Sequence, residues 1–160
     1  MKMTKLGSMG WLMVAAMSAA CLPLIGGCQG TGALIPPKDP DLKKTAAQFA
    51  ADAAKRTYPA DSPRGGDAQA QASVDHGVFN RIEMLNLSDE NWTELEVWVN
   101  GTWVFHVTNW PAHSLKKVNF ATLFDRDGKP FPMDNKAVRV NKIEILREGK
   151  VYDVPMKLAD

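Results

Sequence analysis

The sequence predicts a mainly β fold, a small antiparallel β-sandwich or open barrel that follows an apolar N-terminal segment and one short helix. From Val74 onward the chain alternates apolar and polar side chains and is rich in valine and tryptophan, a texture that favours strands. Turn signals divide this part at Asn100-Gly101, at residues 125–128 and at Glu148-Gly149. Short strands separated by regular turns are typical of sandwiches and small barrels.

The first 27 residues have the organisation of a secretory signal. Lys2 and Lys5 form a short basic region, and residues 9–25 carry no charge. A transmembrane helix needs about 20 apolar residues. This run is shorter, and Pro23 interrupts it near its end. We therefore expect residues 1–27 to be a cleaved signal peptide, and the alternative is a permanent transmembrane helix.

The run Ile25-Gly26-Gly27-Cys28 ends this segment with an aliphatic residue, two small residues and a cysteine. It resembles the processing site of bacterial lipoproteins. The resemblance implies cleavage between Gly27 and Cys28 and a diacylglyceryl group on Cys28, often with an amide-linked chain. Cys21 competes less well, because Ser18 stands where the pattern has an aliphatic residue. The alternative is that both cysteines are merely small apolar residues.

The resemblance places the protein in the cell envelope, attached to a membrane through the lipid on Cys28. Gln29 follows the cysteine, which resembles proteins sent to the outer membrane, facing the periplasm or the surface. No cysteine follows Cys28, so the mature chain is expected to have neither a disulfide nor thiol chemistry.

The composition excludes some classes of partner. The 160 residues include 19 basic and 18 acidic side chains, for a formal net charge of +1, and no block of like charge occurs. The sequence therefore shows no footprint for nucleic acid, and we expect no nucleic-acid partner and no cofactor.

Residues 28–38 are rich in glycine and proline and are predicted to be a spacer after the lipidated residue. A helix is predicted over 39–58, with Asp39 as its cap, Pro40 at its first position and Pro59 ending it. Its apolar face is narrow and mostly alanine. It could pack on the following domain, dimerise or form a stalk, and we expect weak tertiary contacts.

Residues 59–73 have little to bury and are predicted to be a disordered linker, so that the β module spans 74–160. Seven strands are expected, near 77–87, 92–99, 102–108, 115–120, 129–132, 138–147 and 150–158. Around Gly101 we expect a three-residue loop, Val99 to Gly101, that pairs Val97 with Trp103. This register leaves Glu94, Glu96, Trp98 and His106 on the outer face.

A second resemblance concerns about half of the chain, residues 80–147. The run 91–100, Asn-Trp-Thr-Glu-Leu-Glu-Val-Trp-Val-Asn, is followed by Phe124-Asp125-Arg126-Asp127-Gly128 and by Phe131. This order is similar to a β module of bacterial secreted and lipid-anchored proteins. The motifs look like folding determinants, and the resemblance implies no activity.

Few residues suggest chemistry. Asp125, Asp127 and Asp134 invite a calcium site, but Gly128 directly follows the second aspartate and the expected glutamate is missing, so we predict a β-turn. The three histidines are too scattered for a metal set. No nucleophile motif occurs, so we expect no catalytic residues.

Trp98 and Trp110 are the candidate ligand-binding residues, because exposed aromatic side chains are a usual platform for sugars or protein partners. The alternative is that the predicted helix covers Trp98 and that Trp110 closes one end of the sandwich. The first hypothesis is thus a lipid-anchored envelope protein with a non-catalytic structural or protein-interaction module. The alternatives are a carbohydrate- or peptidoglycan-binding lipoprotein and an enzyme with an unrecognised site.

Overall fold

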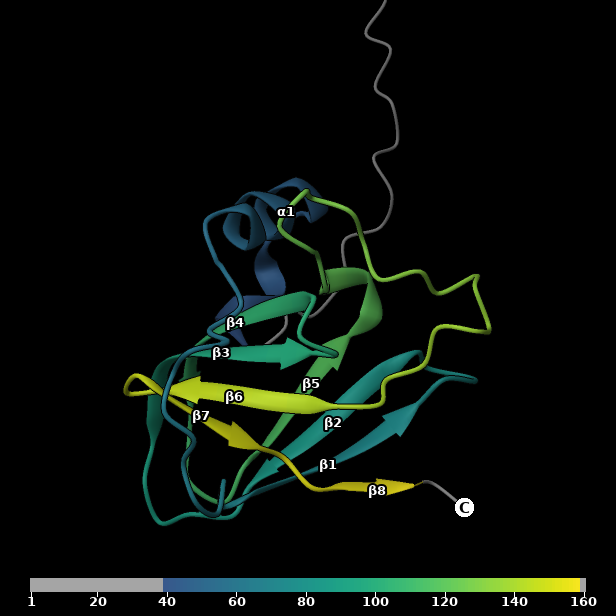
Figure 1. Cartoon of the computed structure of the whole chain (residues 1–160). Coiled ribbons are helices and arrows are strands. Elements are labelled where there is room, and N and C mark those ends of the chain that lie inside the picture. Colours follow the sequence, from purple (N-terminus) through teal and green to yellow (C-terminus); the bar gives the residue numbers. More distant parts are fainter. Residues whose placement is uncertain (1–38, 159–160) are drawn as a thin grey trace, which may run out of the picture. The chain divides into compact units, whose positions relative to one another are not determined.

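The computed structural model describes residues 39–158 (Figure 1). The predicted signal peptide, Cys28 and the predicted spacer lie outside the described residues. The prediction of a mainly β fold is confirmed, because eight strands form two four-stranded sheets that do not close into a barrel. In the described part of the chain, no helix is both long enough and apolar enough to span a membrane.

The first sheet has the strand order β4-β3-β6-β7, and every neighbouring pair is antiparallel. Its strands are β3 (Trp92–Val99), β4 (Trp103–Trp110), β6 (Ile143–Arg147) and β7 (Lys150–Asp153). β3 has both predicted bounds, β6 ends at the predicted Arg147 and β7 begins at the predicted Lys150. These bounds were predictable because Asn-Gly and Glu-Gly turns mark them.

The second sheet has the order β5-β2-β1-β8. Its strands are β1 (Ala70–Asp75), β2 (Arg81–Asn86), β5 (Leu115–Asn119) and β8 (Met156–Leu158). The β1–β8 pair is parallel, so the sandwich is not wholly antiparallel as predicted. The two sheets bury one core between them, and both contribute side chains that are at most 1 % exposed, among them Leu95, Val97, Ile145, Ile82 and Met84.

The β3–β4 hairpin has a three-residue loop, as predicted, but the loop lies one residue further along. Val99 pairs with Trp103 and Val97 with Phe105, so the loop is Asn100 to Thr102 and the predicted pair of Val97 with Trp103 is wrong. Moving the loop by one residue changes the cross-strand register by two residues. Because side chains alternate with a period of two, the same apolar face still points inward. Asn100 and Gly101 both have positive φ, at 52° and 65°, which is the conformation that Asn-Gly favours.

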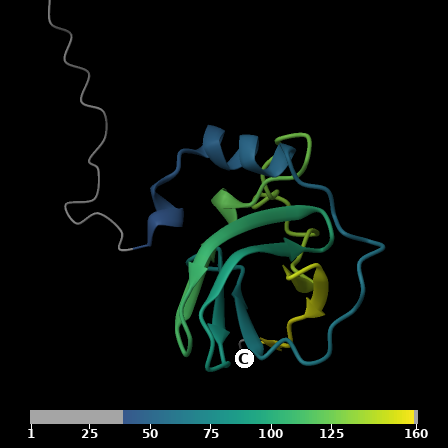
Figure 2. The ribbon, with the colours of Figure 1, turned by 90° about the vertical axis from the view of Figure 1, so that its left-hand side faces the viewer.

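The helix predicted over 39–58 is interrupted, and this prediction is wrong in extent. A 3₁₀ turn, η1 (Pro40–Lys43), begins at the predicted cap Asp39, and a separate helix, α1 (Ala46–Ala54), follows. Thr45 starts α1 with a capping box that it shares with Gln48, which satisfies free backbone groups at that point. Phe49 stacks on Phe105 with ring centroids 5.7 Å apart, so α1 packs along the β4 edge (Figures 1 and 2).

Residues 55–69, which we call the strap, run across the outside of the first sheet and join its edge (Figure 2). The backbone N–H of Gly65 donates to the Val151 carbonyl at 2.8 Å, and that of Val151 donates to Pro63 at 2.9 Å. Gly65 lies against the Tyr152 ring, where an added Cβ would come within 2.0 Å of ring carbon. The prediction of a disordered linker over 59–73 is therefore wrong.

The predicted module boundary near Ser73 is also wrong, because strand β1 begins at Ala70 and the described residues 39–158 belong to one compact unit. The reason lies in side-chain size. Ala70 and Ala72 point into the core while Gln71 is half-buried on the other face. Buried and less buried positions therefore alternate as in any strand, but alanine is too small to make the alternation recognisable in the sequence.

The connection between β5 and β6 holds less strand than predicted. The range 129–132 contributes only an isolated bridge between Phe124 and Pro130, and β6 begins at Ile143 rather than near 138. The predicted turn at 125–128 is confirmed. Asp125 Oδ1 accepts from the N–H groups of Asp127 and Lys129 at 3.0 and 2.8 Å, and Gly128 has φ +77°.

Candidate functional site

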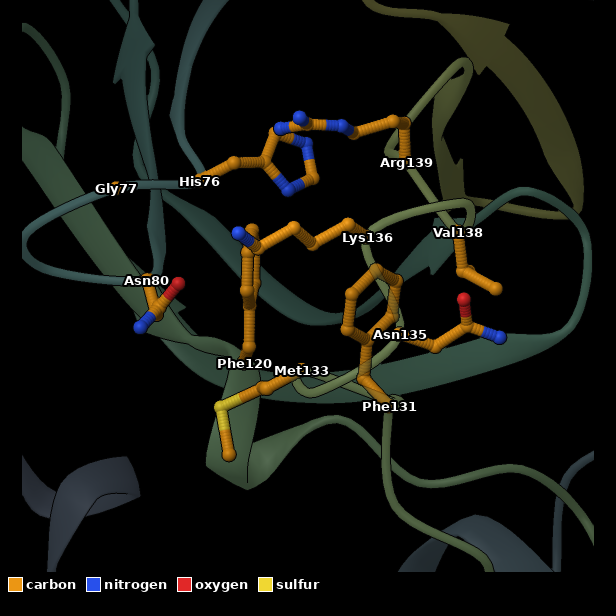
Figure 3. Close-up of a pocket in the computed structure, with 10 residues that line it drawn as sticks. All are labelled: His76, Gly77, Asn80, Phe120, Phe131, Met133, Asn135, Lys136, Val138 and Arg139. Carbon is orange, nitrogen blue, oxygen red and sulfur yellow. The ribbon is translucent and has the colours of Figure 1, made fainter.

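A pocket of about 490 Å³ opens at the end of the sandwich that holds the β1–β2 loop and the long segment before β6 (Figures 1 and 3). Ten residues line it: His76, Gly77, Asn80, Phe120, Phe131, Met133, Asn135, Lys136, Val138 and Arg139. They come from three places in the chain. The backbone N–H of Phe120 donates to the Asn80 carbonyl at 2.9 Å, which ties η2 (Phe120–Thr122) to the β1–β2 loop.

The floor of the pocket is aromatic. Phe120 and Phe131 are buried, and their ring centroids lie 4.7 Å apart (Figure 3). Phe131 also contacts Trp103 of β4 edge-on at 4.9 Å, which anchors the floor to the first sheet. Because neighbouring rings already hold both phenylalanines in place, a ligand above them would order these side chains little further.

The wall of the pocket is cationic. Lys136 and Arg139 are both exposed, and neither forms an ion pair with a carboxylate among residues 39–158. No acidic residue belongs to the lining. Asp75, the last residue of β1, is a carboxylate close to His76, and its Oδ1 accepts from the N–H groups of Gly77 and Val78 at 2.6 and 3.1 Å. The lining therefore presents unneutralised positive charge.

His76 contributes no charge to this wall. Its burial, and next the positive charge of Arg139, lower the pKa of His76. The backbone N–H of Val140 lies 3.2 Å from its Nε2, an arrangement that requires this nitrogen to be unprotonated. His76 packs against Phe120 at 5.1 Å, so it serves as a neutral edge of the aromatic floor.

Two carboxamides complete the lining. The Asn135 Oδ1 accepts from the Ala137 N–H at 3.0 Å, which leaves its amide group to donate elsewhere. Asn80 has positive φ, at 47°, and its side chain faces the pocket (Figure 3). A carboxamide offers a donor and an acceptor together, which is what a peptide group in a ligand would need.

Exposed apolar side chains occur in two of the segments that line the opening, the β1–β2 loop and the segment before β6. Val78 is 83 % exposed, Phe79 56 % and Met133 44 %. Only two other large apolar side chains of residues 39–157 are comparably exposed, Leu87 and Leu115, and they lie toward the opposite end of the second sheet. A cluster of this kind around a hollow is typical of an interaction surface.

A neighbouring pocket of about 590 Å³ shares His76 and Arg139 with the first. It extends the hollow toward β8 and adds the cation Lys157, together with the apolar side chains of Val140 and Met156. The two pockets together form a groove, which we call the end groove.

The structure corrects the prediction for the two tryptophans. Trp98 is 3 % exposed and Trp110 is fully buried, so neither offers a platform. Tyr58 of the strap covers Trp98 edge-on at 5.5 Å, and the Trp98 indole donates to Glu96 at 2.8 Å. Trp110 packs against Trp92 and donates to the Ser114 carbonyl at 3.0 Å, which closes the other end of the sandwich.

The histidines are separated, as the sequence indicates. His106 Nε2 lies 3.0 Å from a carboxylate oxygen of Glu94, although the residue opposite His106 in the register is Glu96. His113 contacts Asp89 at 2.8 Å near the opposite end from His76. Over the described ranges, no three His, Cys, Asp or Glu side chains gather in a way that could hold a metal ion.

Sequence reasoning missed both the end groove and the buried carboxylate of Glu144. Glu144 is fully buried under the strap, where it accepts from the Tyr58 hydroxyl at 2.7 Å, from Lys142 at 2.8 Å and from Arg64. Burial by itself would raise the pKa of Glu144, but the hydrogen bonds from these cations and from Tyr58 lower it. The signal for the groove was the Val78-Phe79 pair between Gly77 and Asn80, an apolar pair in a turn.

Comparisons with protein-family models, curated proteins and solved structures found no match for this chain.

Proposed function

We propose that the protein is a lipid-anchored component of the cell envelope whose β-sandwich is a non-catalytic module that binds another envelope protein. The lipid on Cys28 supplies the location, and the end groove supplies the binding surface. The observation that carries the binding role is the meeting of three features at one end of the sandwich. These are an aromatic floor, unpaired cations and an exposed apolar rim.

A binding role fits this lining better than catalysis does. The ionisable groups of the pocket are Lys136, Arg139 and a histidine of lowered pKa. Cations of this kind hold an anion, whereas acid–base catalysis needs a titrating group paired with a nucleophile or a second carboxyl group. The ten lining residues offer no such pair.

Intact mass of the protein from the membrane fraction of its native host tests the anchor. We expect loss of residues 1–27 and the added mass of acyl chains. Cys28→Ser should abolish the added mass, whereas Cys21→Ser should leave it unchanged. An unprocessed mass, or a cleaved chain without acyl groups in the soluble fraction, would refute the anchor.

A photo-crosslinking amino acid placed in the native host tests the binding surface. Phe79 and Leu87 make a matched pair, because their side chains are 56 % and 49 % exposed and lie at opposite ends of β2. We expect one discrete crosslinked protein from position 79 that is absent from position 87. Identical crosslinking patterns from the two positions would contradict the proposed surface.

A further inference from the structure

We infer that the end groove binds an acidic peptide segment, one that places an apolar side chain on Phe120 and Phe131 and a carboxylate near Lys136 and Arg139. The inference rests on the proposed function, because it names the chemistry of the partner at that same surface. It commits to a peptide, and the other occupants are outcomes of the test.

Charge complementarity is the first argument. Lys136 and Arg139 line the first pocket, and Lys157 lines the second, so three cations border one groove. Among the residues that line the two pockets, Asp75 is the one carboxylate, and its Oδ1 accepts from the N–H groups of Gly77 and Val78 while its Oδ2 accepts from that of Phe79 at 3.4 Å. A ligand that enters the groove therefore meets net positive charge, and a carboxylate can accept two parallel hydrogen bonds from a guanidinium.

The shape of the groove is the second argument. Phe120 and Phe131 line the hollow but are only 1 % and 2 % exposed, so they lie beneath it and do not protrude from the surface. A hollow of about 490 Å³ takes one large apolar side chain with its backbone. A flat membrane surface would touch Val78 and Phe79 but could not reach this floor.

The amide groups are the third argument. Asn80 and Asn135 lie on opposite sides of the floor, and the amide of Asn135 remains free to donate (Figure 3). An extended peptide carries alternating donors and acceptors, which such side chains can satisfy on both sides of an inserted residue. If a membrane covered the groove instead, its acyl chains would remove the water from these amides without offering them hydrogen bonds, which is unfavourable.

Fluorescence anisotropy with the full chain in zwitterionic detergent tests the inference. The labelled probe is the acetylated, amidated pentapeptide Asp-Gly-Phe-Gly-Asp. Two matched peptides replace both aspartates by asparagine or the phenylalanine by alanine. We expect the probe to bind with a Kd below about 1 mM, and each matched peptide to bind about tenfold more weakly.

Variants of exposed residues assign the binding to the groove without risk to the fold. Arg139→Gln and Lys136→Gln should each weaken binding of the probe by about tenfold, because each removes a charge-assisted hydrogen bond. Lys150→Gln is the matched control, since Lys150 is equally a surface cation but lies at the start of β7, outside the groove. It should leave the Kd unchanged.

Three results would overturn the inference. The first is equal affinity for all three peptides, and the second is an unchanged Kd in both groove variants. The third is binding to phosphatidylglycerol vesicles, but not to the peptide, that Arg139→Gln weakens, since the groove would then face a membrane. A correct acyl mass and a crosslink at position 79 together with failed peptide binding would leave the proposed function standing. Peptide binding without acylation would refute the anchor alone.

Discussion

Asp41 and Lys116 form a buried ion pair that fastens the start of the described chain to both sheets. Asp41 is 2 % exposed and Lys116 4 %. The ammonium group lies 2.7 Å from carboxylate oxygens of both Asp39 and Asp41. Asp41 also accepts from the Thr108 N–H of β4 at 3.1 Å, while Lys116 belongs to β5. The pair therefore bridges the open side of the sandwich between its two edge strands.

Replacing Lys116 by methionine should destabilise the fold strongly. The change keeps the apolar stem but leaves the Asp41 carboxylate buried without its cation, which costs about 3–5 kcal/mol. Urea unfolding followed by tryptophan fluorescence measures the loss. Lys117→Met is the matched control, because Lys117 is exposed and lies 3.6 Å from its partner Glu83, so its loss should be within about 0.5 kcal/mol. Equal losses in the two variants would contradict a buried role for Lys116.

The burial of charge explains which residues the sequence could not place. Glu144, Asp41 and Lys116 belong to residue types that are almost never buried, so sequence reasoning leaves them outside. Each is buried because a segment far away in the chain covers it, and side-chain type carries no information about such a cover. By contrast, the role of Asp125 was predictable, since its partners are the N–H groups of its own turn.

Among the elements, strand β3 was predicted correctly from the sequence, whereas strand β1 was missed. The bounds of β3 agree with the predicted 92–99, because alternation and an Asn-Gly turn are both local. Strand β1 was missed, because alanine, glutamine and serine pack well but show no β preference. The residues that line the first pocket of the end groove come from three segments that are distant in the sequence. No single stretch of sequence could therefore predict the groove.

Gly101→Val should destabilise the hairpin by about 1–2 kcal/mol, the cost of holding a side chain in the left-handed region. Gly101 has φ +65°. An added Cβ would also stand 3.4 Å from the Tyr58 ring, so the substitution would press on the strap as well as on the turn. The midpoint of urea unfolding measures the effect. Gly66→Val is the control, since a Cβ there meets nothing within 4 Å. A larger effect at Gly66 than at Gly101 would refute this account of the turn.

The whole described unit is held together by contacts between its N-terminal layer and the sandwich. The strap reaches the first sheet through Arg56 with Glu96, Tyr58 with Glu144 and Arg64 with Glu144. Helix α1 adds the stacking of Phe49 on Phe105. Because these contacts join distant parts of the chain, we expect the layer and the sandwich to unfold in one transition.

Stability should fall at acid pH in two stages. Burial, and next Arg139, lower the pKa of His76 from 6.5, so its contribution is complete above pH 6.5 and is lost as the pH falls through its folded pKa. The pKa of Glu144 is lowered from 4.5 and that of Asp41 from 3.8, because cations and N–H groups outweigh their burial. Their contributions are lost below those values, and this second decline should be steeper.

Urea midpoints measured between about pH 8 and pH 3 check both stages. Glu144→Gln should be less stable at neutral pH and should lose less on acidification, because the glutamine cannot titrate. A midpoint that stays constant down to pH 4 would contradict the stage assigned to His76, and an unchanged acid decline in Glu144→Gln would contradict the role of that carboxylate.

The parallel pairing of β1 with β8 has a consequence for how the chain is made. β8 supplies the outer neighbour of β1, and the Ala72 N–H donates to the Pro155 carbonyl at 2.9 Å. Until residues 155–158 have been synthesised, one edge of β1 therefore has no hydrogen-bonded neighbour and the second sheet is incomplete. Pairing of segments so distant in sequence is slow, because the intervening loop must close first. The second sheet thus lacks its outer strand until the last residues emerge, and a fold completed so late would be compatible with the export that we propose.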